Sequence, residues 1–386
     1  MLSNIPKMNL IQFLFHLQFF AAVTVPFFTE WGGLNFRQVM LLQSWFLFWV
    51  FAFEVPTGAF ADKLGRKKSI VLGCITAGIG AFVYSSIPSI YIFMLAEFLW
   101  ALGTAFISGA DEAIIYDTLK TFKLQARSKD TFAKYSMILS LAFIIASPLG
   151  SIIAVKFGLN YPMLFSGVPM ALAGIIALTL KEPKRKAETK RNYLSIMKES
   201  MLYIRRHPKL RPLVINSILG GALLYYILWL YQVMLKNSGV GIGFYGWVSS
   251  GMNIFLILLL SQITRLEALL GRKNLIAATL LIPGIAFVAG AFITNFVVTI
   301  LLILAIFGAW GFRAPLYSSY FNVHIPSKSR ATMLSSISML AKIAAAVLNL
   351  FVGAMMDWSV QGTMIAIGVA ALGVAVFSRV REEELK

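Results

Sequence analysis

Long apolar stretches, separated by short polar segments, run through the whole chain. Apolar runs of about 20 residues recur, and each can cross the roughly 30 Å hydrocarbon core of a bilayer as a helix. Polar and apolar residues do not alternate within these runs, so the pattern predicts helices and argues against barrel strands. Twelve spans are predicted, at approximately residues 9–29, 38–60, 69–87, 90–113, 133–155, 161–180, 212–235, 243–264, 274–293, 295–320, 331–355 and 361–379.

Composition agrees with an all-α polytopic membrane protein. The mean hydropathy is +0.79, and 59% of the residues are hydrophobic against 13% charged, which lies outside the range of soluble domains. The first apolar run is not a secretory signal, because it is too long, lacks a small-residue cleavage site and is followed by further spans. The single cysteine, Cys74, lies in an apolar run, which indicates a buried small side chain. We expect no metal and no cofactor.

The basic residues predict the orientation of the chain. With a cytoplasmic N-terminus, the cytoplasmic segments hold 29 of the 34 Lys and Arg residues. The opposite loops hold Arg37, Lys156 and Lys236, and the spans hold Arg313 and Lys342. By the positive-inside rule both termini are cytoplasmic. The net charge of +18 is therefore explained by topology, and we expect a lipid bilayer and no nucleic acid as partner.

A basic segment divides the chain into two halves. Residues 181–211 form the longest hydrophilic stretch and carry eleven Lys or Arg residues. Apolar residues recur in it at helical spacing, which predicts a short amphipathic helix in the membrane interface, a flexible linker being the alternative. These residues are Tyr193, Met197, Met201 and Ile204. We predict a six-helix bundle at 1–183, a cytoplasmic linker at 184–210 and a six-helix bundle at 211–386.

The two halves share short motifs in corresponding places. Leu64–Lys67, reading Leu-Gly-Arg-Lys, follows the second span, and the same four letters follow the eighth at Leu270–Lys273. Residues 136–140 and 331–335, at the starts of the fifth and eleventh spans, are also similar. Together these matches indicate a duplicated six-span unit.

The charged stretch between the second and third spans resembles the signature loop of the major facilitator superfamily. Residues 58–68 read Gly-Ala-Phe-Ala-Asp-Lys-Leu-Gly-Arg-Lys-Lys. The resemblance implies two six-helix bundles that work by alternating access, with the substrate site between them near the bilayer midplane. It also implies that the loop latches the halves on the cytoplasmic side through the eleventh helix. The expected latch residues are Gly58, Asp62, Gly65, Arg66, Asp111 and Asp117.

Physical chemistry suggests how this loop works. Gly58 and Gly65 permit close helix approach and a tight turn. Asp62 can accept hydrogen bonds from the first N–H groups of the third span, or pair with Arg66. Alternatively, the basic residues of the loop only determine topology. Asp111 and Asp117 lie near the cytoplasmic end of the fourth span, where a structural or latch role is favoured.

Ionisable residues inside the spans are functional candidates because charge is costly there. Glu54 lies in the second span and Glu97 in the fourth, and either can be a proton-coupling site. His16, in the first span, can relay protons. The alternative is that these acids pair with cations and hold helices together. Glu97 stands where the fourth helix of the family often carries an Arg, which weakens transfer of the family's usual proton relay.

Aromatic and basic residues mark a second candidate site in the C-terminal half. They form a predicted substrate cavity with Tyr225, Tyr226, Trp229, Gln232, Arg313 and Lys342. Aromatic side chains within a span can line a cavity for an amphipathic solute, whereas those at its edges belong to an interface belt. In an alternative function, as a carrier of a small organic anion, Arg313 and Lys342 bind the substrate.

The sequence favours a secondary transporter over an enzyme. It has no nucleotide-binding loop, no paired metal ligands and no nucleophile elbow. The first hypothesis is a proton-coupled antiporter that exports small amphipathic or drug-like solutes, with weak support from a Pro-x-Gly pattern at 148–150 in the fifth span. The alternatives are a carrier of a small organic anion, a lipid flippase or a non-transporting sensor. We expect a monomer in the plasma (inner) membrane.

The topology yields a first prediction. Tags placed at residue 188 and at the C-terminus should both be accessible only from the cytoplasm, and a cysteine at residue 238 should react with an impermeant maleimide from outside. Labelling of intact cells and of inverted vesicles measures all three. One tag on the wrong side would contradict the count of twelve spans.

Overall fold

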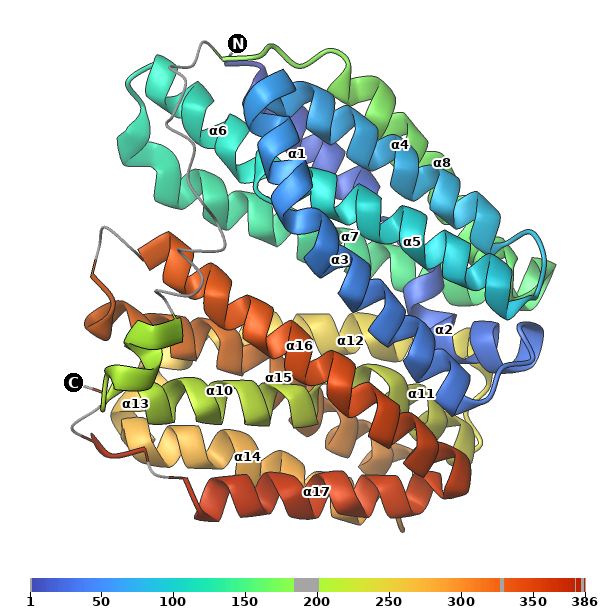
Figure 1. Ribbon diagram of the computed structural model, residues 1–386. Helices are drawn as coiled ribbons and strands as arrows, with labels where there is room; N and C mark the ends of the chain where they lie inside the picture. Colours follow the sequence, from blue (N-terminus) through green and yellow to red (C-terminus); the bar gives the residue numbers. More distant parts are fainter. Residues whose placement is uncertain (1, 184–200, 327–329, 379, 383–384, 386) are drawn as a thin grey trace. The chain divides into compact units, whose positions relative to one another are not determined.

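The computed structural model describes residues 2–183, 201–326, 330–378, 380–382 and 385 (Figure 1). Every regular element in these residues is helical. The chain forms two compact units. One consists of Met1–Thr189 with Ile242–Ser250, and the other of Lys190–Gly241 with Gly251–Lys386.

The helices of the two units are defined as follows. The first unit contains α1 (Asn4–Phe15), α2 (Thr24–Pro26), α3 (Phe36–Leu64), α4 (Arg66–Tyr84), α5 (Ile90–Ile107), α6 (Ala110–Thr121), α7 (Ser128–Phe157) and α8 (Tyr161–Ala177). The second contains α10 (Leu210–Leu224), α11 (Ile227–Asn237), α13 (Ile263–Leu270), α14 (Arg272–Gly290), α15 (Phe296–His324), α16 (Arg330–Trp358) and α17 (Val360–Val376). Helix α12 (Ile242–Ser261) contributes to both units, and its first half packs on α7, where Gly246 N–H donates to Ser151 Oγ at 2.6 Å.

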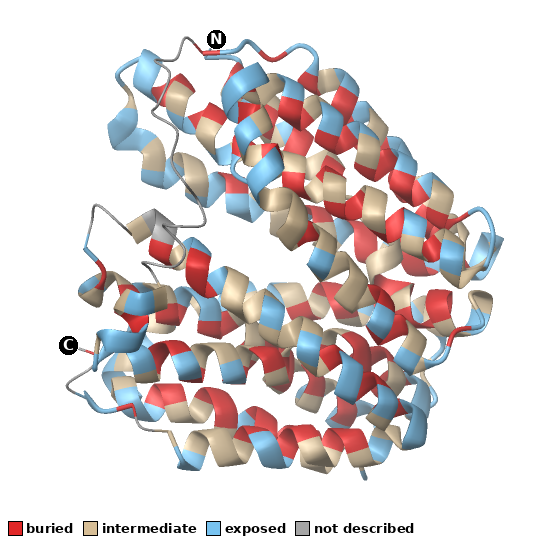
Figure 2. Ribbon diagram, viewed as in Figure 1, coloured by how far each residue is buried: buried red, intermediate tan, exposed pale blue. Residues whose placement is uncertain are grey.

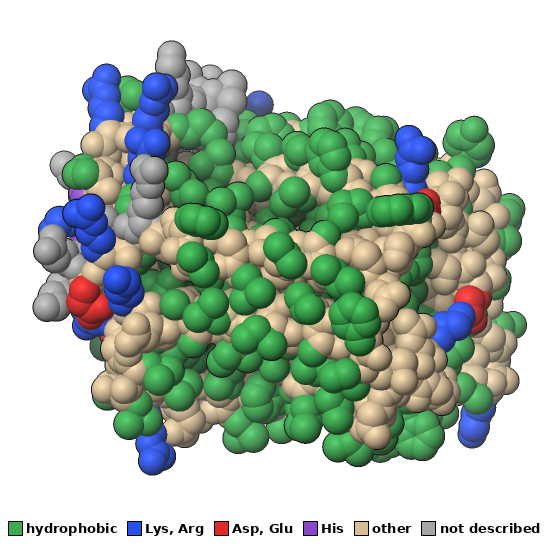
Figure 3. Space-filling model, turned by 90° about the horizontal axis from the view of Figure 1, so that it is seen from below, with side chains coloured by type: hydrophobic (Ala, Val, Ile, Leu, Met, Phe, Trp, Pro, Cys, Tyr) green, Lys and Arg blue, Asp and Glu red, His purple; other side chains and the backbone are tan. Residues whose placement is uncertain are grey.

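The twelve predicted spans are confirmed. In the described residues, ten helical segments are long and apolar enough to cross a membrane. Two shorter apolar helices, Tyr161–Ala177 and Val360–Val376, coincide with the predicted sixth and twelfth spans. Buried residues lie where helices of a unit meet (Figure 2). On the face that Figure 3 shows, hydrophobic side chains cover the middle and charged ones gather toward the ends, as expected for a surface in lipid.

The described residues include only part of the predicted linker. Residues 184–200 lie outside the described residues, and with them Tyr193 and Met197. Residues 201–206 are helical, with Ile204 buried. The boundaries predicted for the bundles and the linker stay predictions.

Four of the predicted spans are interrupted in the described residues, which the sequence pattern did not indicate. The first span breaks after α1, the fourth breaks between α5 and α6, the seventh breaks between α10 and α11, and the eighth breaks near its end, between α12 and α13. Gly109 explains the break in the fourth span, since its φ of 75° lies in the left-handed region that glycine tolerates.

The break in the first span is stabilised by its neighbours. Phe19 N–H donates to Ser166 Oγ of α8 at 2.9 Å, so a backbone group freed by the break is bonded within the protein. A Cβ on Gly150 of α7 would lie 1.7 Å from the Phe19 carbonyl oxygen. Glycine at this position therefore lets the broken segment lie directly against α7.

Close helix packing in the first unit depends on a glycine pair. A Cβ on Gly103 of α5 would lie 2.7 Å from the carbonyl oxygen of Gly73 of α4, and one on Gly73 would lie 2.8 Å from that of Gly103. Small residues at a helix interface let the two backbones approach, which is a main source of attraction between helices in lipid.

The glycine pair generates a second prediction. Gly103→Ala should lower the thermal stability of the purified protein, because the added methyl must push α4 and α5 apart at a cost of about 1–3 kcal/mol. Gly373→Ala on α17 is the matched control, since nothing lies within 4 Å of its Cβ. It should leave the melting temperature unchanged or raise it. Equal melting of both variants would refute the packing argument.

Candidate functional site

The 58–68 segment forms a sharp junction between two helices. Residues 58–64 are the last turns of α3, and Gly65 alone separates α3 from α4. Gly65 has φ 109° and ψ 144°, a conformation that favours glycine. A Cβ there would also approach the Glu182 carboxylate to 3.1 Å. The expected role of Gly65 in a tight turn thus has a clear structural basis.

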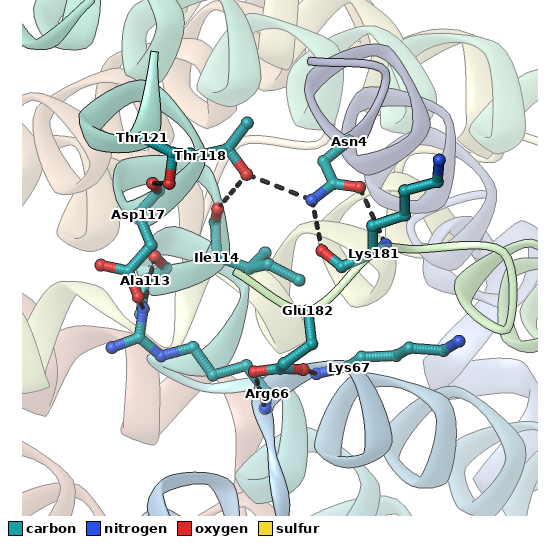
Figure 4. A network of polar contacts seen from close by, with 10 residues as sticks. All are labelled: Asn4, Arg66, Lys67, Ala113, Ile114, Asp117, Thr118, Thr121, Lys181 and Glu182. Atoms are coloured by element: carbon teal, nitrogen blue, oxygen red, sulfur yellow. Dashed lines mark hydrogen bonds and ion pairs between the residues drawn. The ribbon is translucent and has the colours of Figure 1, made fainter. Parts of the chain in front are cut away.

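Arg66 ties this junction to the end of the fourth span. Its guanidinium forms an ion pair with Asp117 of α6, and it also donates to the Ala113 carbonyl at 2.6 Å (Figure 4). Both side chains of the pair are largely buried, with 17% and 20% exposed. Two of the predicted latch residues, Arg66 and Asp117, are therefore in direct contact within the first unit.

Glu182 closes the same junction from the other side. Its carboxylate accepts hydrogen bonds from Arg66 N–H at 3.0 Å and from Lys67 N–H at 2.8 Å (Figure 4). These are the first N–H groups of α4, which have no partner inside the helix. A carboxylate at a helix N-terminus also interacts favourably with the helix dipole.

Contacts of the kind expected of Asp62 are also made by other residues. Glu182 takes the helix N–H groups and Asp117 takes the Arg66 side chain, whereas Asp62 is exposed in the last turn of α3. Gly58, on the same turns of α3, is half-buried. The assignment of Asp62 and Gly58 to a latch stays a prediction.

The second unit repeats this arrangement. Gly271, with φ 75°, separates α13 from α14. Arg272 pairs with Glu267, and Lys273 N–H donates to the Glu382 carboxylate at 3.2 Å. Glu382 follows the last helix of its half, as Glu182 does in the first half. The shared Leu-Gly-Arg-Lys letters therefore adopt similar local structures, each closed by a glutamate that sequence analysis missed.

Buried asparagines join the helix ends in each unit. Asn4, which is fully buried, donates to Thr118 Oγ1 at 3.2 Å and to the Lys181 carbonyl at 2.8 Å (Figure 4). In the second unit, Asn216 donates to Ser378 Oγ at 2.9 Å and accepts from Tyr317. In both units an asparagine on the first span thus bridges the fourth span and the segment after the sixth.

Arg313, predicted to contact substrate, is held inside the second unit. It is 3% exposed. Its guanidinium donates to Thr279 Oγ1 at 2.6 Å and to the backbone and side-chain oxygens of Asn216 at 2.7 and 2.9 Å. Gly220 makes room for it, since a Cβ there would lie 2.3 Å from Nη2. Arg313 therefore links α10, α14 and α15 through neutral acceptors in the described residues.

The aromatic residues predicted for the cavity surround the break in the seventh span. Tyr225 and Tyr226 form the break, and the Tyr226 hydroxyl donates to Asn349 Oδ1 of α16 at 3.0 Å. Trp229 and Gln232 on α11 are buried, at 6% and 1% exposure. Tyr225 is half-buried, as is Lys342 on α16. In the second unit, Tyr225 and Lys342 are thus the more accessible members of the predicted set.

Glu97 is the most deeply buried acid among the predicted coupling residues. It lies on α5, is 6% exposed, and accepts a hydrogen bond from Gln43 Nε2 of α3 at 2.8 Å. Gln43 is an uncharged partner. Gln43 was missed by sequence analysis, although a lone amide in an apolar span is the kind of residue that indicates a buried polar partner.

The remaining coupling candidates lie elsewhere in the first unit. Glu54 is half-buried on α3. His16 ends α1, where its Nδ1 lies 2.9 Å from the Gln12 carbonyl oxygen and its ring packs against Phe143 of α7. Asp111, expected in the latch, begins α6 at the break of the fourth span and accepts from the Tyr135 hydroxyl at 3.0 Å.

The fold and these sites define a helical membrane transporter. A family model described as Major Facilitator Superfamily matches residues 8–243. The chain belongs to the major facilitator superfamily.

Relatives with curated names agree with this assignment. An uncharacterized MFS-type transporter of Methanocaldococcus jannaschii is 22% identical over 293 residues, covering 74% of this chain and 72% of that protein. Multidrug resistance protein 2 of Bacillus subtilis is 28% identical over 143 residues, covering 37% of this chain and 34% of that protein. The second match thus spans about a third of each protein.

Solved transporter structures share the fold. A bacterial homolog of the human lysosomal transporter Spinster has a TM-score of 0.81 at 15% identity, covering 100% of this chain and 98% of that chain. The nucleoside transporter NupG has a TM-score of 0.78 at 14% identity, covering 99% of this chain and 98% of that chain. At such identities the likeness concerns the fold alone.

The Glu182 contacts generate a third prediction. Glu182→Ala should destabilise the start of α4 by about 0.5–2 kcal/mol, the usual cost of a lost helix cap, and lower the melting temperature. Glu182→Gln, which keeps one acceptor oxygen, should have a melting temperature between those of the wild type and Glu182→Ala. Glu112→Ala, an exposed acid on α6, serves as control. An unchanged melting curve for Glu182→Ala would show that the cap is dispensable.

Proposed function

We propose that this chain is a proton-coupled exporter of small amphipathic or drug-like solutes. Two findings support the proposal. Its relatives include two multidrug resistance proteins of Bacillus subtilis, each 28% identical over about a third of the chain. Its first unit also holds a carboxyl, Glu97, in a buried and uncharged setting.

Glu97 is the observation that carries the coupling proposal. A carboxyl that moves protons across a membrane must exist in both charge states during the cycle. Charged side chains at membrane depth are costly unless paired, and the hydrogen-bond partner of Glu97 in the described structure, Gln43, is neutral. An ion pair would fix the carboxylate in one state, whereas neutral donors leave protonation accessible. Glu54, less buried on α3, is the second candidate.

A carrier of small organic anions is the alternative, and it has less support. It assigns substrate binding to Arg313 and Lys342. The guanidinium of Arg313 already donates to Thr279 and Asn216 in the interior of the second unit. Its location favours a role in joining helices, which leaves Lys342 as the more accessible cation for an anion.

The remaining parts of the proposal follow from the sequence. The carrier is a monomer in the plasma membrane. Both termini lie in the cytoplasm, because basic residues concentrate on that side. Asp62 and Arg66 belong to a cytoplasmic latch. The Arg66–Asp117 ion pair and the Glu182 cap fix the α3–α4 junction on which both residues lie.

A fourth prediction tests the coupling residue. Glu97→Gln should abolish solute efflux driven by a pH gradient in proteoliposomes, because the amide cannot exchange a proton. Substrate binding and downhill exchange should be retained, since they need the binding site but not the proton. Glu54→Gln is the parallel variant. Retention of full gradient-driven efflux by both variants would exclude these carboxyls as the coupling site.

The same assay distinguishes proton-coupled export from the alternative function, the transport of organic anions. If the chain carries organic anions, Arg313→Gln and Lys342→Gln should lose binding itself, and the two acids should be dispensable. Lys156→Gln, on the last turn of α7, serves as a control for the loss of one positive charge.

A further inference from the structure

Two of the three histidines of the chain lie together in the second unit. His207 ends residues 201–207, here called the linker end, and His324 is the last residue of α15. Their rings are 5.6 Å apart, at an interplanar angle of 55°. The Tyr203 ring lies 5.4 Å from that of His207, and the Tyr203 hydroxyl donates to the His324 carbonyl at 3.1 Å. These contacts join the linker end to the end of α15.

His207 also caps the start of α10. The Leu210 N–H, the first of that helix, donates to His207 Nδ1 at 3.1 Å. The first N–H groups of a helix have no partner inside it, so the ring supplies one. Nδ1 can accept only while it carries no proton, and the neutral ring then holds its proton on Nε2. This geometry therefore requires a neutral His207.

The charges around His207 oppose its protonation. Partial burial, followed by the nearby His324 and Lys209, lowers the pKa of His207 from its ordinary value of 6.5. An imidazolium at the N-terminus of α10 would also interact unfavourably with the helix dipole. The other charged residues of the linker end and the first turn of α10 are cations as well, namely Arg205, Arg206 and Arg211.

The neighbouring elements supply no compensating carboxylate in the described residues. Glu267 and Glu382 interact electrostatically with Tyr320 of α15, but not with His207. Helix α16 contributes Arg330, a further cation, which donates to a backbone carbonyl of α15 at 3.3 Å. A proton on His207 therefore adds a charge among cations and withdraws the acceptor from the start of α10.

We propose that His207 and His324 form an acid-sensitive joint, which attaches the linker end to α10 and α15 while His207 is neutral and releases it when His207 binds a proton. Ile204, 7% exposed, is the apolar part of this attachment, since it belongs to one buried cluster with Phe321 in the last turn of α15. The linker end closes the basic segment between the two halves, so the joint sets how firmly that segment is attached to the second unit. With both termini in the cytoplasm, as proposed above, the joint responds to cytoplasmic pH.

The lowered pKa gives the sign of the pH effect. Between the pKa of His207 in the folded chain and its ordinary value of 6.5, the unfolded chain binds more protons than the folded one. Stability therefore falls as the pH drops through this window. Above the window the joint keeps its full contribution.

Hydrogen exchange of the purified full chain tests the joint. After correction for intrinsic rates, the amides of residues 201–212 should lose protection about fivefold, the value of one hydrogen bond. The loss should occur between about pH 7.5 and about pH 5.5, which bracket the ordinary histidine pKa. Helix α17 has no titratable side chain, so its protection serves as the internal reference and should not change.

Histidine variants separate titration from packing. His207→Asn supplies an acceptor oxygen that does not titrate, so protection should stay high at both pH values, whereas His207→Ala should give low protection at both. His324→Asn removes a cation that lowers the pKa of His207, so the loss should begin at a higher pH. His16→Asn, which changes the third histidine of the chain, is the matched control and should behave like the wild type.

The outcomes are distinct. A loss of protection in His207→Asn equal to that of the wild type would overturn the proposal, as would wild-type protection that is the same at both pH values. Should His207→Ala fold poorly, His207→Asn and His324→Asn still test the joint. The measurement involves no transport, so its result is independent of the proposed proton-coupled export.

Discussion

The structure depends on one constraint, that backbone N–H and C=O groups at membrane depth must find partners within the protein. In hydrocarbon this demands helices, and it makes every break in a helix conditional on a local substitute. The break after α1 has one, because Ser166 accepts from Phe19 and Gly150 lets that backbone approach α7. At the α3–α4 junction a single residue, Gly65, separates the two helices. There the Glu182 carboxylate accepts from the backbone N–H groups of Arg66 and Lys67, which have no partner within the helix.

Hydropathy predicts what this constraint dictates locally and misses what depends on tertiary contact. All twelve spans could be read from the sequence, since each is a property of about 20 consecutive residues. The interruptions could not, because the one after α1 depends on Ser166 and Gly150 of other helices. The contacts of Arg66 could be read only in part for the same reason. Asp117 was expected in the latch but not as the partner of Arg66, and Glu182 was not expected. Both are brought close by the packing of α6 and of the segment after α8.

The internal repeat shows which of these contacts belong to the design of a six-span unit. Glu182 and Glu382 follow the last helix of their halves, and each accepts from the first turn of the third span of that half. Asn4 and Asn216 likewise occupy matching places. Contacts present in both units are best explained by folding of the unit. The contact between Glu97 and Gln43 is a feature of the first unit, and such differences between the halves are where specific function is expected.

The treatment of buried charge extends this argument. In the second unit the buried cation Arg313 donates to acceptors on α10 and α14, and its removal would take one hydrogen-bond partner from both Asn216 and Thr279. This is the pattern of a group that holds helices together. In the first unit the buried acid Glu97 accepts from one neutral side chain, Gln43, and so joins only α3 and α5 by hydrogen bonds in the described residues. A residue that changes charge during a cycle must not be essential to packing in either state. On this criterion Glu97 of the first unit is the better candidate for the proposed proton coupling, and Arg313 belongs to the packing of the second unit.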